Sequence, residues 1–185
     1  MSLRAAKVST ATSNLRSTHL DILVSPSVSD FPAFDRPGLL KAVLGQFRIN
    51  RDGAHGTQHW ARVRKHALTV GQATGADSLV VELFAFLHDS QRENEYVDPG
   101  HGHRATQYAR SLKNLYFELT PTQLEKLCEA MSGHSDGQLH ADPTIQTCWD
   151  ADRLDLGRVG KKPHAKYMSA EASKHIEKAY EWSRN

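Results

Sequence analysis

Apolar residues recur along most of this chain at the three- and four-residue spacing that marks one face of an α-helix. The pattern predicts helices separated by polar turns, with no internal repeat and no pair of strands. The expected helices cover about residues 37–47, 57–74, 77–89, 103–112, 120–133, 142–156 and 169–182. We therefore expect an all-α, single-domain bundle of about six to seven helices.

The third of these segments is apolar almost all round over residues 79–87, which predicts a central, buried helix. Asp77 is the expected N-cap of this helix. The polar stretch that follows, residues 90–102, is broken by an Asp-Pro-Gly sequence and predicts a loop. Loops above a rigid scaffold are common places for functional sites.

Length and composition limit the organisation of the chain. With 185 residues, 39% of them apolar, the chain can build one substantial core, which we place in residues 31–185. Residues 1–30 are rich in Ser, Thr and Ala and predict a mobile N-terminal arm, with an organelle transit peptide as the alternative.

Charge and cysteine content exclude several classes of function. The net charge is +2 and the basic residues are scattered, so no dedicated nucleic-acid surface is expected. No apolar run reaches the roughly 20 residues of a membrane span. The two cysteines, Cys128 and Cys148, form neither a disulfide scaffold pattern nor a thiolate zinc motif. A soluble, cytoplasmic protein fits these features best.

The most informative residues are His88 and Asp89, which end the apolar helix. His59 lies on the inward face of the preceding helix, and Asp152 belongs to a later one. Imidazole nitrogens and carboxylate oxygens are ligands of divalent cations. A hydrogen-bonded polar network is the alternative, but two buried carboxylates without a cation or partner would cost several kcal/mol. A site with open coordination positions indicates hydrolysis by a metal-activated water.

Three fragments of the chain are similar to the signature of the HD-domain superfamily of metal-dependent phosphohydrolases. They are residues 55–63 (HGTQHWARV), 88–90 (HDS) and 150–155 (DADRLD). The resemblance covers roughly residues 35 to 160 and implies a metal site in the core of a helical bundle. The ligands that it implies are His59, His88, Asp89 and Asp152. The last aspartate of the family precedes a basic residue and Leu, which favours Asp152 over Asp150.

Further histidines lie between the His-Asp pair and the last aspartate. In superfamily members with two metals, such histidines bind the second ion. His101 and His103 are the first candidates, separated by a glycine that we expect to be flexible, and His134 is the other. We favour His101 with His134, and phosphate binding is the alternative role for these residues. The expected cofactor is one or two divalent ions, with Mn, Fe, Mg, Ni and Zn all open.

The resemblance implies a phosphohydrolase that attacks a phosphate ester of a nucleotide or another small molecule with metal-bound hydroxide. Some family members carry a water-orienting acid three residues after the Asp of the His-Asp pair. Arg92 stands there in this chain and Glu93 follows it, so the predicted catalytic residues are Asp89, Arg92 and Glu93. Residues near the ligands that we expect to bind substrate are Arg62, His103, Arg104 and Arg153.

The expected partner is a small phosphorylated substrate, and the sequence leaves a homo-oligomer open. Two other functions also stay open. One is a metal-stabilised module that binds and senses nucleotides, and the other is a dinuclear-iron oxygenase.

Overall fold

The computed structural model describes residues 34–184, so the arm predicted for residues 1–30 lies outside the described residues. The eight α-helices of this part are α1 (Arg36–Gln46), α2 (Thr57–Thr74), α3 (Ser78–Leu87), α4 (His101–Leu112), α5 (Pro121–Gly133), α6 (Pro143–Leu154), α7 (Ala170–Ser173) and α8 (Ile176–Trp182). Two 3₁₀ helices follow α6, η1 (Asp155–Val159) and η2 (Ala165–Tyr167). Within residues 34–184 extended pairing is limited to isolated bridges, which confirms the all-α prediction.

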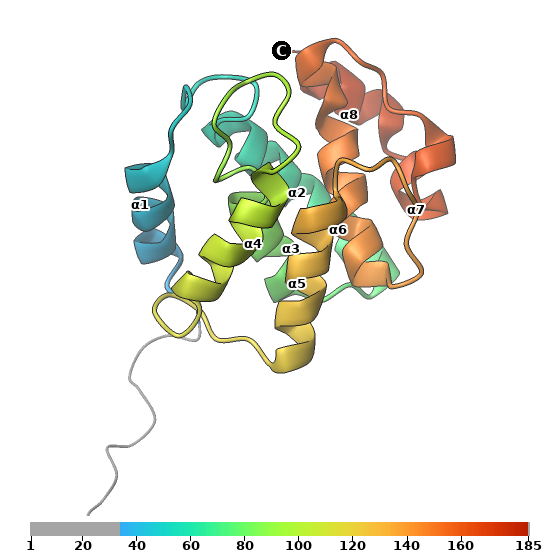
Figure 1. Ribbon diagram of the computed structural model, residues 1–185. Helices are drawn as coiled ribbons and strands as arrows, with labels where there is room; N and C mark the ends of the chain where they lie inside the picture. The colour runs from blue at the N-terminus through green and yellow to red at the C-terminus, as the bar shows by residue number, and fades with distance from the viewer. Residues whose placement is uncertain (1–33, 185) are drawn as a thin grey trace, which may run out of the picture. The chain divides into compact units, whose positions relative to one another are not determined.

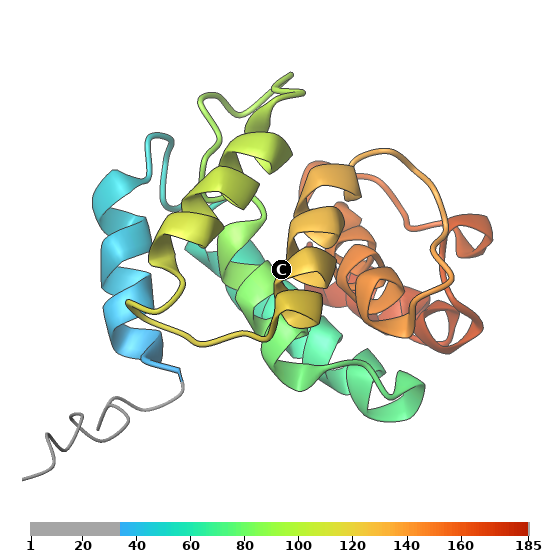
Figure 2. The same ribbon diagram turned by 60° about the horizontal axis from the view of Figure 1, so that its bottom comes forward.

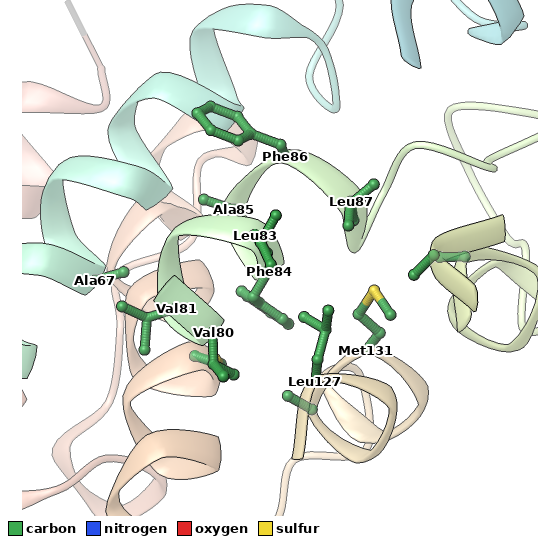
Figure 3. Close-up of a cluster of buried hydrophobic side chains, with 14 of the residues drawn as sticks. Ala67, Val80, Val81, Leu83, Phe84, Ala85, Phe86, Leu87, Leu127 and Met131 are labelled. Carbon is green, nitrogen blue, oxygen red and sulfur yellow. The ribbon is translucent and has the colours of Figure 1, made fainter. Parts of the chain in front are cut away.

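Helix α3 is the centre of the bundle, as its apolar sequence predicts. Every residue from Val80 to Leu87 is buried, and α3 contacts α1, α2, α5 and α6. Figure 3 shows Phe84 directed toward α5, where Leu127 and Met131 lie, and Val81 near Ala67 of α2. Figure 2 shows α1 and the helices after α4 on opposite sides of α3.

Glu82 is the one charged residue in the buried part of α3. Its carboxylate accepts two hydrogen bonds from Arg36 of α1, at 2.8 and 2.9 Å, and one from Arg64 of α2. Burial acts to raise the pKa of Glu82, but the two guanidinium groups outweigh it and lower this pKa. The carboxylate therefore joins three helices around the core.

Side-chain caps fix where the central helices begin. Asp77 accepts from the backbone N–H groups of Leu79 and Val80 at the start of α3, as the sequence predicts. Thr120 and Gln123 form a capping box at the start of α5. Because the chain alternates direction, the ends of α3, α5 and α6 lie on the same side of the bundle as the beginnings of α2 and α4, in the upper half of Figure 1.

The structure corrects three predicted boundaries. Helix α4 begins at His101 rather than near His103. The predicted sixth helix stops at Leu154 and continues as η1. The predicted helix 169–182 is broken between α7 and α8, because the backbone bonds of Lys174 and His175 tighten to the i→i−3 pattern.

The structure also describes the two cysteines and the hydropathy of the helices. Cys128 and Cys148 are both free and buried. In the part of the chain that the structure describes, no helix has the length and hydropathy required to cross a bilayer.

Candidate metal centre

The helix ends on this side of the bundle carry a cluster of histidines and aspartates. His59 lies in the first turn of α2, His88 and Asp89 directly follow α3, and Asp152 lies in the last turn of α6. His59, His88 and Asp89 are at most 1% exposed. The bundle thus brings distant parts of the sequence to one buried point.

These four residues face one another closely. His59 Nε2 lies 3.1 Å from His88 Nε2, 3.5 Å from Asp89 Oδ2 and 3.4 Å from Asp152 Oδ1. His88 Nε2 lies 3.4 Å from the same oxygen of Asp89. Asp152 is therefore the late aspartate at this centre, and Asp150 is directed elsewhere: its carboxylate accepts from Ser169 and Gln146.

A second group of donors lies on the other oxygen of Asp89. Asp89 Oδ1 is 3.3 Å from His101 Nε2 and 3.7 Å from His134 Nε2, and these two nitrogens are 2.9 Å apart. His59, His88 and Asp89 form one group that could hold a metal ion, and Asp89, His101 and His134 form another. The Asp89 carboxylate is shared by both groups.

The orientation of the four imidazole rings suits metal binding. In each ring, Nδ1 donates to an acceptor on the side away from the centre. For His59 this acceptor is Asp155 Oδ2. For the other three it is a backbone carbonyl: that of Phe84 for His88, of Asp98 for His101 and of Met131 for His134. Because a carbonyl only accepts, Nδ1 carries the proton in the neutral ring and Nε2 presents a lone pair to the centre. The lone pairs of His59 and His88 face each other, as do those of His101 and His134, which is the arrangement that a shared cation stabilises.

Two further observations test this fit. Asp152 Oδ1 is buried and accepts no hydrogen bond from the described residues. Two nitrogens bound at right angles to one ion, each at about 2.1 Å, would lie about 3.0 Å apart. The Nε2 pairs are separated by 3.1 and 2.9 Å. The donors thus fit a divalent cation in each group.

The carboxylates of the centre are ionised at neutral pH. Burial acts to raise the pKa of Asp89, but the surrounding histidines outweigh it and hold this pKa well below its usual range. Burial opposes ionisation of Asp152 in the same way, but Arg158 and the histidines lower its pKa to about 2. The same negative field raises the pKa of His134 against the effect of its burial. The centre therefore attracts positive charge.

Asp155 supports His59 from behind and was not singled out by the sequence. It is fully buried, and its Oδ2 accepts from His59 Nδ1 at 2.7 Å. Arg62, which we expected to bind substrate, instead donates to both oxygens of Asp155, at 2.6 and 3.2 Å. Arg62 therefore positions a ligand instead of lining the pocket. The spacing Asp152–Asp155, one turn at a helix end, is the signal that could have identified Asp155.

Gly102 brings α4 and α5 together so that His101 meets His134. A Cβ atom at Gly102 would lie 2.3 Å from the carbonyl oxygen of Met131. The glycine is thus a close-packing position inside a helix and not the flexible link that the sequence led us to expect. His103 is exposed and contacts Gln107, so the structure directs it away from the centre.

An open pocket of about 310 Å³ lies above the centre. Asp89, Asp152 and His134 form part of its wall, together with three arginines, Arg92, Arg153 and Arg158. The sequence drew attention to the first two arginines but not to Arg158, which stands in η1, outside the helical pattern.

Two of these arginines are held at the edge of the centre by backbone carbonyls. Arg92 donates to the carbonyls of Asn94 and Tyr96, and its Nη1 lies 3.5 Å from Asp89 Oδ1. Arg158 donates to the carbonyl of Ala54 at 2.8 Å, and its Nη2 lies 3.6 Å from Asp152 Oδ1. Both guanidinium groups are therefore fixed before any ligand binds.

The remaining predicted site residues lie outside this wall. Glu93 is half exposed and pairs with Arg48 at 2.6 Å, so it does not replace the missing acid of the family pattern. Arg104 binds both oxygens of Asp98, at 2.7 and 2.6 Å. Both side chains are turned by the helix and loop geometry toward nearby charges of opposite sign.

The chain resembles a protein of known structure over most of its length. That protein is a predicted HD superfamily hydrolase from an uncultured Thermotogales bacterium, with 25% sequence identity and a TM-score of 0.63. The match covers 80% of this chain and 87% of that one. No protein-family model and no curated protein matches the chain. The structural match and the His/Asp cluster confirm the resemblance to the HD superfamily.

Proposed function

We propose that this chain, a protein of the HD superfamily type, is a metal-dependent phosphohydrolase that acts on a phosphate ester of a nucleotide or another small molecule. The observation that carries the proposal is the meeting of four histidine Nε2 atoms and two ionised carboxylates beneath a pocket lined by three arginines. Such a donor set holds cations, and such a wall binds phosphate.

His59, His88, Asp89 and Asp152 would hold one divalent ion, and Asp89, His101 and His134 a second. When bound there, the cation lowers the pKa of a water molecule toward neutrality and polarises a phosphoryl oxygen. The four imidazole donors favour Fe, Ni or Zn over Mg.

The protein's own side chains bind and orient the reacting groups. Arg92 and Arg158 lie next to Asp89 and Asp152, where they can donate to the oxygens of the phosphoryl group and stabilise its charge as the leaving oxygen departs.

The test combines elemental analysis of the purified protein with a screen of nucleotides and phosphate esters in the presence of Mn, Fe, Ni, Zn or Mg. We expect bound metal and hydrolysis, both lost on chelation. Asp89→Asn should lose both while circular dichroism shows unchanged helix content. Unchanged metal stoichiometry and turnover in this variant would refute the proposal.

The same experiment separates the alternatives. Tight nucleotide binding without turnover over the whole panel would indicate a sensing module. Bound iron with oxygen consumption would indicate an oxygenase. A cytoplasmic location and the nucleotide nature of the substrate remain predictions from the sequence.

A further inference from the structure

Arg153 differs from the other two arginines of the pocket in what it contacts. It lies in the last turn of α6 and is 6% exposed. Its Nη1 donates to the carbonyl of Tyr167, and its guanidinium lies over the ring of Trp149, 5.6 Å from the centroid. These contacts fix the plane of the group, so Arg153 is a rigid part of the pocket wall.

One nitrogen of this guanidinium has no hydrogen-bond acceptor in the described part of the chain. Nη2 of Arg153 is buried and has no hydrogen-bond partner among residues 34–184. Within residues 34–184 Arg153 forms no ion pair with a carboxylate. Arg92, in contrast, pairs with Asp89, and Arg158 pairs with Asp152. The charge of Arg153 is thus not paired within this part of the chain, and Arg153 lines the pocket, where an anion can pair with it.

Arg153 has different partners from the two arginines at the metal centre. Arg92 and Arg158 face Asp89 and Asp152, whereas the Arg153 side chain reaches the backbone of Tyr167, which also lines the pocket. One phosphoryl group at the centre would engage Arg92 and Arg158. It would leave Arg153 for a different anionic group of the same substrate.

The charge of the pocket supports a strongly anionic ligand. Among the residues that line it, three arginines oppose two aspartates, a net charge of +1 with neutral histidines. A single divalent ion raises this to +3. A phosphomonoester dianion would not balance that charge, but a diphosphate or a longer chain would.

We propose that Arg153 forms a second anion subsite, so that the substrate carries a diphosphate or longer phosphate chain, with one phosphoryl group at the metal centre and the next against the part of Arg153 that lines the pocket. This inference rests on the proposed function, because that function is what places the first phosphoryl group at the metal centre. The binding of a second phosphate at Arg153 can nevertheless be measured without turnover.

The test is calorimetric binding of inorganic orthophosphate and inorganic pyrophosphate to metal-loaded protein. Free metal is first removed by gel filtration, and metal content is checked after each titration because pyrophosphate chelates cations. The unmodified protein should bind pyrophosphate at least about 10-fold more tightly than orthophosphate, as expected for one added charged hydrogen bond. Equal affinities would overturn the inference without any variant.

Arg153→Gln should remove most of this preference and leave orthophosphate affinity within about 2-fold, since one charged hydrogen bond is lost only with the longer ligand. Arg110→Gln, at an exposed position of α4, is the matched control and should change neither affinity. If Arg153→Gln does not fold, Arg153→Lys keeps the charge and should reduce the preference in part. Equal loss of both affinities, or of neither, would contradict the subsite.

The outcome is distinguishable from that of the proposed function. An Arg153-dependent preference for pyrophosphate without hydrolysis of any ester would support the subsite and count against the phosphohydrolase. Adenosine 5′-diphosphate, titrated in parallel, shows whether the preferred chain is inorganic or carried by a nucleoside. Binding at least as tight as that of pyrophosphate supports a nucleoside-linked chain, and much weaker binding supports an inorganic one.

Discussion

The contact between Asp155 and His59 gives the sharpest test of how the fold prepares the metal centre. Asp155 is buried, its Oδ2 accepts a hydrogen bond from His59 Nδ1 with the two atoms 2.7 Å apart, and Arg62 donates to the same carboxylate. Asp155→Asn preserves the size of the side chain but removes its charge and weakens the hydrogen bond that it accepts from the imidazole of His59. Loss of such a supporting partner costs about 10- to 100-fold in metal affinity. That range corresponds to about 1.4 to 2.8 kcal/mol of binding free energy.

The assay is competition of the variant with a chelator of known affinity, below the unfolding temperature of each protein. Asp150→Asn is the matched control because Asp150 is equally buried, lies on the same segment and bonds Ser169 and Gln146 instead of a ligand. We expect Asp150→Asn to keep the metal affinity of the unmodified protein. If Asp155→Asn stays within about 2-fold of that affinity, or if both variants lose equally, the assigned role of Asp155 is wrong.

Three further variants test the fold around the centre. Glu82→Gln should lower the free energy of unfolding by about 1–2 kcal/mol, because its two partly exposed arginine partners lose a charged acceptor. Urea denaturation measures this change, and an unchanged free energy of unfolding would show that the three-helix junction is dispensable. Gly102→Ala must push α4 from α5, since its Cβ would meet the Met131 carbonyl at 2.3 Å. We expect a loss of about 1–3 kcal/mol and weaker binding of a second ion, and full metal stoichiometry would contradict this. His66 is buried, which lowers its pKa from 6.5 to about 4. Because the unfolded chain binds the proton first, stability should fall by up to about 3 kcal/mol as the pH drops from about 6.5 to about 4, and His66→Phe should flatten this dependence in metal-free protein.

The helices could be predicted because their signals are local. The hydrophobic periodicity, the caps and the turn residues lie within a few positions of one another. Asp77 caps the helix that the sequence assigns to it, and Thr120 and Ser169 cap helices at the predicted starts of 120–133 and 169–182. The break between α7 and α8 has no such local signal. There α7 packs on α2 and α6, while α8 packs mainly on η1 and also on α6, so tertiary contacts decide where the helix ends.

The candidate site divides in the same way. Side chains whose chemistry is unusual in a core, such as His88 and Asp89, could be found from residue type and order. The roles of the arginines could not, because nearness in sequence does not give direction. Arg62 follows His59 by three residues and therefore shares its face of α2, which turns it toward the partner of that histidine. Arg158 reaches the centre from η1, a segment whose conformation the periodicity did not predict.

The position of the centre at helix ends explains how the backbone prepares its ligands. The last carbonyls of a helix have no N–H partner from a following turn, or have a lone pair left over. His88 and His134 directly follow α3 and α5, and each donates its Nδ1 proton to a carbonyl of the turn before it, those of Phe84 and Met131. The fold thereby fixes the tautomer that directs Nε2 inward. The negative ends of the same two helices add a field that favours a cation. Fraying of the last turn of either helix should therefore release the metal before the bundle unfolds, which hydrogen exchange with and without the ion can detect.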